Sequence, residues 1–363
     1  MSNNAIVQED ALKAPFPYFG GKSSIAAEVW AALGQPKHYI EPFFGSGAVL
    51  LMRPSYIPGE HVETVNDSDG FVCNVWRALK SDPDEVAKWC DWPVNHADLS
   101  ARKKRLIENE SRLLENLIAD DTWCDPKLAG YWIWAASCWI GGGLTRVGQI
   151  PHLSDAGKGV HKIGSRPHLS HAGVGVHKIG QRPHLCNAGK GVHKIGSRPH
   201  IAKQSPGVHK LSMRGDGAIY DWFHRLSERL RHVRVVCGDW TRVCGGDWQD
   251  RMGPVGIFFD PPYGVTDRDT DVYHHDSTDV AAAVRDWCLK RGDRPSHRIV
   301  LAGYDEHEAL LEHSWTVKRW SAHGGYANLK RNDGEAQGKE NRHREALYFS
   351  PHCVNTRQEV LGV

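Results

Sequence analysis

The sequence predicts an α/β protein whose sheet is interrupted by a long insertion. Short apolar runs alternate with helical patterns near both ends of the chain, which is the order of elements expected for a parallel sheet. Between these parts, residues 82–141 have a helical pattern and residues 151–214 form a repeat. A chain of 363 residues, 40% hydrophobic and 24% charged, is long enough for two folded domains.

The first part of the sheet lies within residues 6–80. We expect a helix over residues 23–33, a strand at residues 38–40, a turn, and a helix that ends near residue 50. A second strand at residues 62–65 leads into Asn66 and Asp67, and the helix that follows ends near residue 79. Each strand is therefore followed by a turn and a helix.

Residues 82–141 predict helices because apolar side chains recur at helical spacing among charged ones. This stripe consists of Leu99, Leu106, Ile107, Leu113, Leu114, Leu117 and Ile118. After the repeat we expect a helix over residues 218–231 and strands at residues 233–236, 255–259 and 298–302. Strands from both sides of the insertion are thus expected in one sheet.

The repeat has a period of 16 residues, which is visible in the Pro-His pairs that begin at Pro151, Pro167, Pro183 and Pro199. Seven Lys and three Arg against one acid give residues 151–210 a net charge of +9, so the rest of the chain carries −7. Nine of the 22 histidines also lie here. The near-neutral total of +2 therefore hides two oppositely charged parts.

Gly and Pro in every unit of the repeat exclude a helix and favour short extended pieces joined by turns. Its Lys and Arg side chains suit contacts with phosphates, independent of base sequence. The candidates at fixed offsets are Lys162, Arg166, Lys178, Arg182, Lys194, Arg198 and Lys210. The alternatives are a solvated loop without a ligand, an array that reads bases, and metal capture by His residues, which lacks Cys or acids to complete a coordination shell.

Composition excludes several other classes of protein. Nine cysteines without a close CxxC pair favour reduced thiols over a disulfide framework or a zinc site, and we expect no metal. The sequence has neither a signal peptide nor an apolar run of the ~20 residues that a membrane-spanning helix needs. We therefore expect a soluble, cytoplasmic protein.

The run Glu41-Pro42-Phe43-Phe44-Gly45-Ser46-Gly47 lies between an expected strand and an expected helix. Glycines at this place allow a tight turn and close approach of the backbone to a nucleotide-like cofactor, although many such turns are only turns. The spacing is not that of a dinucleotide motif. At the end of the next strand, Asp67 could accept ribose hydroxyls or cap the following helix.

The run Asp260-Pro261-Pro262-Tyr263 follows the strand expected at residues 255–259. The prolines fix the backbone, so the carboxylate of Asp260 and the carbonyl of Pro261 can act as a rigid pair of acceptors. Two acceptors on an exocyclic amine favour a pyramidal nitrogen with an available lone pair, while Tyr263 stacks on the base. An ordinary strand-ending turn is the alternative interpretation.

Together with residues 16–22 (FPYFGGK) and 238–240 (GDW), these two motifs resemble the Dam-like, alpha-group DNA adenine-N6 methyltransferases in identity and order. Residues 130–134 and 143–146 resemble the helix and turn that lead into the family's DNA-contacting hairpin. The resemblance covers residues 14–80, 130–146 and 218–350. Gly141 to Gly143 and the repeat depart from the family pattern, which leaves the choice of target site open.

The resemblance implies a Rossmann-like sheet that uses S-adenosylmethionine, with residues 1–80 and 216–363 as the catalytic domain. Residues 81–215 would then be an inserted target-recognition domain that includes the four-copy repeat. The positions that match cofactor contacts are Tyr18, Lys22, Glu41, Phe43, Gly45, Gly47, Asp67, Asp239 and Asp260. The catalytic positions are Asp260, Pro261, Pro262 and Tyr263, and Arg146 is a further DNA contact.

We therefore expect an enzyme that flips an adenine out of double-stranded DNA and methylates its N6 amine, encoded by a bacterium or a phage and active in the host cytoplasm. Methylation of cytosine N4 remains an alternative, because the same acceptor geometry serves that amine. Methylation of RNA adenine and a non-catalytic DNA-binding protein are two others.

Overall fold

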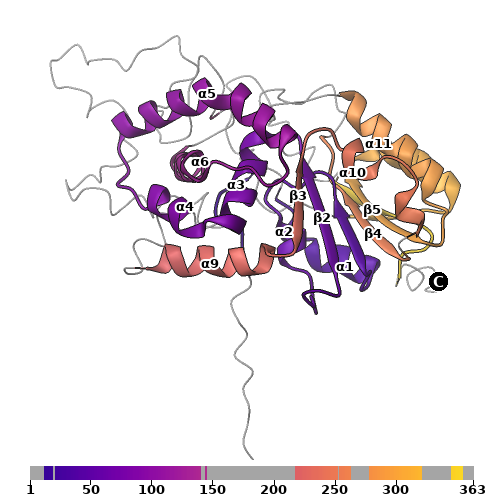
Figure 1. The fold of residues 1–363 in the computed structure, drawn as a ribbon. Coiled ribbons are helices and arrows are strands. Elements are labelled where there is room, and N and C mark those ends of the chain that lie inside the picture. Colours follow the sequence, from indigo (N-terminus) through magenta and orange to yellow (C-terminus); the bar gives the residue numbers. More distant parts are fainter. Residues whose placement is uncertain are drawn as a thin grey trace, which may run out of the picture.

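The computed structural model describes residues 12–18, 21–139, 144, 217–251, 253–262, 278–320 and 345–354. These residues form a seven-stranded sheet with helices on both faces (Figure 1). The strands are β1 (His38–Glu41), β2 (Val62–Asp67), β3 (Val233–Cys237), β4 (Val255–Phe259), β5 (His297–Gly303), β6 (Thr316–Arg319) and β7 (Ala346–Phe349). The predicted α/β class is confirmed.

The strand order is β3-β2-β1-β4-β5-β7-β6, and β7 is antiparallel to both of its neighbours in an otherwise parallel sheet. From β1 the chain forms β2 and then β3 on one side, and it crosses to the other side of β1 to form β4. The strand order therefore reverses between β1 and β4, where Ile40 pairs with Ile257. In open α/β sheets, ligands bind at the carboxyl ends of the strands at such a reversal.

Helices cover the sheet because its strands are apolar on both faces. The helices are α1 (Ala26–Leu33), α2 (Ala48–Leu51), α3 (Gly70–Ser81), α4 (Pro83–Cys90), α5 (His96–Ala119), α6 (Pro126–Cys138), α9 (Ala218–Leu230), α10 (Thr241–Cys244) and α11 (Thr278–Arg291), with 3-10 helices η3 (Trp248–Arg251) and η4 (Asp305–His313). Tyr39 and Val65 face the core shared with α1 and α3, whereas Ile40 and Ile257 face the core shared with α10 and α11.

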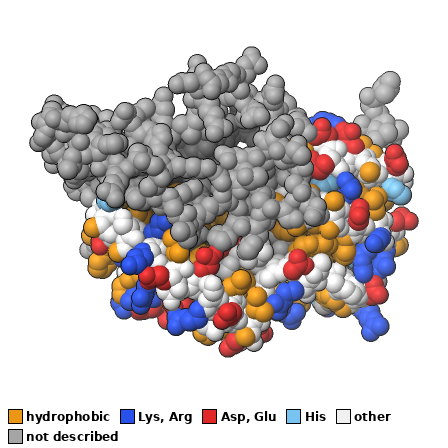
Figure 2. All heavy atoms as spheres, turned by 90° about the horizontal axis from the view of Figure 1, so that it is seen from above, with side chains coloured by type: hydrophobic (Ala, Val, Ile, Leu, Met, Phe, Trp, Pro, Cys, Tyr) orange, Lys and Arg blue, Asp and Glu red, His pale blue; other side chains and the backbone are white. Residues whose placement is uncertain are grey.

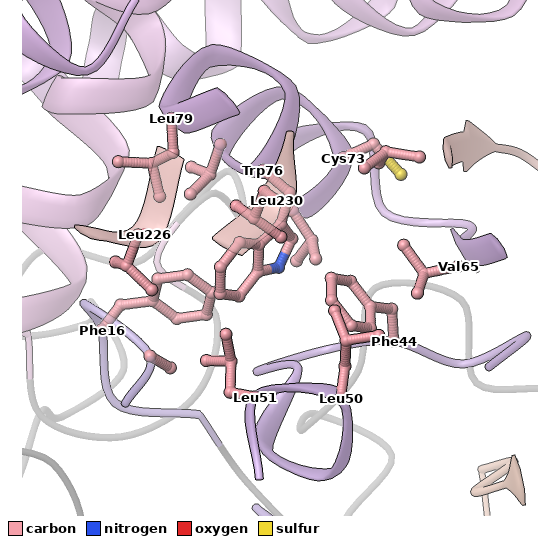
Figure 3. Packing of buried hydrophobic residues seen from close by; sticks show 14 of the residues in the cluster. Phe16, Phe44, Leu50, Leu51, Val65, Cys73, Trp76, Leu79, Leu226 and Leu230 are labelled. Carbon is pink, nitrogen blue, oxygen red and sulfur yellow. The ribbon is translucent and has the colours of Figure 1, made fainter. Parts of the chain in front are cut away.

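The larger core is centred on aromatic side chains from segments that are distant in sequence. The indole of Trp76 in α3 has its ring centroid 5.1 Å from that of Phe44 and 5.6 Å from that of Phe16. Figure 3 shows these three rings packed with Leu226 and Leu230 of α9. The turn after β1, which contains Phe44, is thus anchored in the core of the protein.

The helices α4, α5, α6 and α9 gather beside α3, away from β4 and β5 (Figure 1). Asp82 and Asp125 cap α4 and α6, each of which has a proline in its first turn, so the sequence defines both starts locally. The guanidinium of Arg77 in α3 donates to the carbonyls of Leu117 and Val235, which connects α5 to β3. These helices share one apolar core with α1 and α3, and the division into two domains stays a prediction.

A buried ion-pair network lies at the amino-terminal end of β2. Glu63 accepts from Arg53 at 3.0 Å and from Arg229 of α9 at 2.6 and 2.9 Å. Neither the side chain of Glu63 nor that of Arg53 has any exposed surface. Two guanidinium groups share the one carboxylate, so each buried charge has a partner and the network connects β2 to α9.

The structure confirms the predicted strands and corrects their lengths. β4 spans the predicted residues 255–259, whereas β2, β3 and β5 are each one or two residues longer than expected. The helix expected from residue 23 begins at Ala26, after a turn. The strands β6 and β7 and the helix α11 were not predicted, and the whole repeat lies outside the described residues.

The surface of the described residues carries both kinds of charge. Figure 2 shows Lys and Arg interspersed with Asp and Glu over the described part of that face. The eight cysteines among the described residues are free thiols. In this part of the chain, no helix is both long and apolar enough to cross a membrane.

Candidate active site

The glycine turn after β1 is held by hydrogen bonds on both sides of Gly45. The backbone N–H of Gly45 donates to Oδ2 of Asp67 at 2.8 Å, and its carbonyl accepts from the indole N–H of Trp76 at 2.9 Å. The residue has a φ of +47°, which favours glycine. The turn is therefore fixed to the end of β2 and to α3.

Tyr18 lies directly against this turn. A Cβ atom added to Gly45 would lie 2.5 Å from Cε1 of Tyr18, so a side chain at residue 45 would collide with the ring. Gly47, with a φ of +61°, is similarly close to the ring of Phe44. The two glycines of the motif thus allow aromatic rings to approach the backbone on both sides of the turn.

The carboxylate of Asp67 ends β2 and faces the glycine turn. Its second oxygen, Oδ1, accepts from the backbone N–H of Asp69 at 2.9 Å. Burial, reinforced by the negative charge of Asp69, raises the pKa of Asp67 to about 7. The protein therefore holds a carboxylate here that is only partly ionised near neutral pH.

Asn66, the residue before Asp67, connects the loops that follow three strands. Its side-chain amide donates to the carbonyls of Pro42 and Gly238, both at 3.0 Å. Its own backbone carbonyl accepts from Phe44 at 2.9 Å. From the sequence, Asn66 was noted only as the end of a strand. Its place next to Asp67, at the end of that strand, was the signal that could have marked it as a residue of the site.

The turn after β4 brings Asp260 to the same edge of the sheet. Nζ of Lys22 lies 2.9 Å from Oδ2 of Asp260, across a separation of more than half the chain. Lys22 is 7% exposed and the side chain of Asp260 is 21% exposed, so this ion pair is largely shielded from water. Both residues were expected at the cofactor site, whereas their pairing was not predicted from the sequence.

Glu41 is the last residue of β1 and is fully enclosed beside these groups. Its carboxylate accepts from the hydroxyl of Tyr39 at 2.8 Å. Burial raises the pKa of Glu41 well above its ordinary value, and the negative charge of Asp260 adds to the effect, while the Tyr39 hydrogen bond opposes it. Glu41 is thus held where a positive charge would be favoured.

These segments line one cavity, whose roughly 740 Å³ of empty space includes a part that is open to solvent. It lies at the reversal of strand order and is lined by Tyr18, Gly21, Lys22, Glu41, Phe43, Phe44, Gly45, Ser46, Ala48, Val49, Asp67, Ser68, Asp69, Phe258, Asp260, Pro261 and Pro262. The lining contains four carboxyl groups and one ammonium, and a cationic ligand would favour the ionised forms of Glu41 and Asp67, whose pKa values are raised by burial.

Most of the predicted cofactor residues that the structure describes therefore line one cavity. Gly47 does not, because it packs under Phe44. Asp239 also does not: it is exposed, and its carboxylate accepts from the backbone N–H of Thr241 at the start of α10. Tyr263, Arg146 and the repeat residues predicted to contact DNA lie outside the described residues. Ser46, Ser68 and Asp69 are lining residues that the sequence analysis missed.

A mostly parallel sheet with this cavity at its reversal point, and with an acidic Asp-Pro-Pro turn on its rim, defines a Rossmann-like methyltransferase. Residues 18–119 match the family model of the D12 class N6 adenine-specific DNA methyltransferases, which confirms the resemblance described above. The match supports adenine-N6 methylation of DNA as the activity of the chain. The match includes Tyr18, Lys22, the glycine turn and Asp67, and it ends before Asp260. A search of curated proteins finds no match.

Proposed function

We propose that the methyl donor is S-adenosylmethionine and that it binds in the cavity between the glycine turn and the Asp-Pro-Pro turn. The observation that carries the proposal is the 2.9 Å ion pair between Lys22 and Asp260, because it joins the expected cofactor side and the expected acceptor side in one cavity. Four lining carboxylates favour a donor that carries a sulfonium and an ammonium group.

The residues present offer a partner for each part of such a donor. The ammonium of Lys22 has three donors, so it can hold the donor's carboxylate while it remains paired with Asp260. The carboxylate of Asp67 can accept ribose hydroxyls, and the absence of a side chain at Gly45 keeps the backbone close to the ligand. The ring of Phe43, another lining residue, offers an apolar surface for a purine.

When bound, S-adenosylmethionine supplies an electrophilic methyl group, whose bond to sulfur breaks with its electron pair remaining on sulfur while the new bond to nitrogen forms. Asp260 and the carbonyl of Pro261 would accept the two N6 hydrogens of the adenine, which leaves the nitrogen lone pair available for attack. Asp260 would then take the proton that N6 releases. Tyr263 would stack on the base.

The target is proposed to be an adenine flipped out of double-stranded DNA, since its amine cannot reach the cavity while it is stacked in the duplex. We assign residues 1–80 and 216–363 to catalysis and residues 81–215 to target recognition. Phosphate contacts are proposed for Arg146, Lys162, Arg166, Lys178, Arg182, Lys194, Arg198 and Lys210. Their contribution would be independent of base sequence.

The test is methyl transfer from donor labelled on its methyl group into duplex DNA, followed by separation of the nucleosides. We expect the label in N6-methyladenine, while label in N4-methylcytosine or only in structured RNA would refute the proposed target. Asp260→Ala should abolish transfer without unfolding the protein. The matched control is Asp247→Ala, which removes an exposed carboxylate paired with Arg291 at 3.0 Å and should leave transfer unchanged.

A further inference from the structure

Tyr39 supports the cavity from behind, although it belongs to none of the motifs described above. It is 1% exposed and precedes Glu41 by two residues in β1, so both side chains project from the same face of the sheet. Its hydroxyl donates to Oε2 of Glu41 at 2.8 Å. Glu41 lines the cavity and Tyr39 does not, so the hydroxyl can act on a ligand only through the carboxylate.

The ring of Tyr39 is held in place by its neighbours in the core. Its centroid lies 4.6 Å from that of Trp30 in α1, and the register of the sheet pairs Tyr39 with Glu63 of β2. Burial, and after it the negative charge of Glu41, raise the pKa of Tyr39 well above its ordinary value. The hydroxyl therefore stays protonated and available as a donor to Glu41.

The strand order places Glu41 at the floor of the cavity, since β1 lies between β2 and β4. The register pairs Glu41 with Val65, two residues before Asp67. On the other side it places Glu41 level with Phe258, two residues before Asp260. Glu41 therefore lies between the group proposed for the donor's ribose and the group proposed for the amine, and below both of them.

This position suits the sulfonium of the donor. Its sulfur is bonded both to the ribose moiety and to the methyl group that is transferred, so it would lie between a ribose at Asp67 and an amine at Asp260. An ionised carboxylate at the floor of the cavity would stabilise that positive charge, and shielding from water would strengthen the effect.

The ionisation of Glu41 depends on its hydrogen bond with Tyr39. Burial raises the pKa of Glu41 well above its ordinary value, and the hydrogen bond from Tyr39 is the largest opposing effect. The negative charges of Asp260 and Glu63 raise the pKa further, whereas the backbone N–H of Leu50 lowers it. Without the Tyr39 hydroxyl, the carboxylate would lose a donor that favours its charged form.

We infer that Tyr39 is a positioning residue whose hydroxyl holds the Glu41 carboxylate against the sulfonium, so that the protein binds the donor in preference to its neutral thioether product. The inference rests on the function proposed above. Methyl transfer removes the positive charge from sulfur, so the same carboxylate would hold the product less firmly than the donor.

The experiment measures by calorimetry, without DNA, the affinities of the full-length wild type, Y39F, E41Q and the double variant for S-adenosylmethionine and S-adenosylhomocysteine. In Y39F we expect the affinity for S-adenosylmethionine to fall by about tenfold and that for S-adenosylhomocysteine by less than about twofold, because only the first carries the sulfonium. E41Q should shift the ratio of the two affinities at least as far. In the E41Q background, Y39F should change the ratio by less than about twofold, since the carboxylate on which it acts is gone.

The matched control is Y348F, which removes another buried hydroxyl, a donor to the carbonyl of Tyr304 at 2.7 Å, and should leave the ratio unchanged. An unchanged ratio in Y39F, or an equal loss of affinity for both ligands, would overturn the inference, because a purely structural role affects both alike. A shift that persists in the E41Q background would also overturn it. A wild type that binds neither ligand would instead refute the proposed donor, so the two failures are distinguishable.

Discussion

The backbone N–H of Gly45 donates a 2.8 Å hydrogen bond to Oδ2 of Asp67, so the glycine turn after β1 is held by the last residue of β2. The carboxylate has two functions as a result, because it positions the turn and also faces the cavity. A change at either residue should therefore affect both the geometry of the turn and the binding of the donor.

The pKa of Asp67, raised by burial to about 7, predicts pH-dependent donor binding. An ionised carboxylate accepts hydrogen bonds from ribose hydroxyls at both oxygens, whereas the protonated form loses an acceptor. Affinity for S-adenosylhomocysteine should therefore fall as the pH decreases through about 7 and level off above it, with release of a proton on binding at lower pH. Calorimetric titrations in buffers of different ionisation enthalpy measure both effects.

Asp67→Asn supplies the control for this prediction. The variant should bind more weakly and lose the pH dependence near neutrality, because the titrating group has been removed. A dependence that persists unchanged in Asp67→Asn would show that another group is responsible.

Gly45→Ala should destabilise the fold and weaken donor binding together. The new Cβ would lie 2.5 Å from the ring of Tyr18, at a φ of +47° that L-residues rarely adopt. We expect a loss of about 1–3 kcal/mol in the free energy of unfolding, measured by urea denaturation. Gly59→Ala is the matched control, since Gly59 also has a positive φ but its Cβ would have no neighbour within 4 Å.

A second variant separates the steric effect from the backbone strain. Combining Gly45→Ala with Tyr18→Ala removes the ring that collides, so the double variant should lose less stability than the sum of the two single changes. Additive losses would mean that the collision with Tyr18 is not the cause.

Glu63→Gln should be strongly destabilising although Glu63 does not line the cavity. The substitution leaves Arg53 and Arg229 facing a neutral amide, and an unpaired buried charge costs about 3–5 kcal/mol. The comparison is Lys88→Ala, which breaks the exposed pair with Glu85 and should cost less than about 1 kcal/mol. Similar midpoints of urea denaturation for both variants would contradict the assignment of this network as buried.

Shortening the repeat should reduce the salt dependence of DNA affinity. Deletion of two units removes 32 residues that recur with Lys and Arg at fixed offsets. The logarithm of the binding constant falls with the logarithm of salt concentration by about 0.9 per neutralised phosphate, so the slope should become shallower by several such contacts. An unchanged slope would favour the interpretation of the repeat as a spacer.

Local sequence patterns predicted the elements that carry the cavity. β4 and the end of β1 could be located because an apolar run meets a turn motif within a few residues. The strand β7 could not, because four apolar residues are compatible with several structures and its place in the sheet depends on pairing with β5, more than forty residues earlier in the chain.

The pairing of Lys22 with Asp260 could not be predicted from the sequence either. Each residue belongs to a motif that could be interpreted separately, but their contact depends on the adjacency of β1 and β4, which is a property of the strand order. Asp239 is a different case. Its motif suggested a position near the donor, and this stays a prediction. In the structure the residue is exposed, and its carboxylate accepts from the backbone N–H of Thr241, two residues later.

The helices α6 and α9, which precede and follow the repeat-containing segment, both pack against α4. The two attachment points of that segment therefore belong to one packed group of helices, whatever the length of chain between them. The loop-closure relation for a chain between two fixed ends gives a change of only about 0.2 kcal/mol for one 16-residue unit more or less. A different number of copies would therefore alter the charge of the chain at little entropic cost to the packing of α4, α6 and α9.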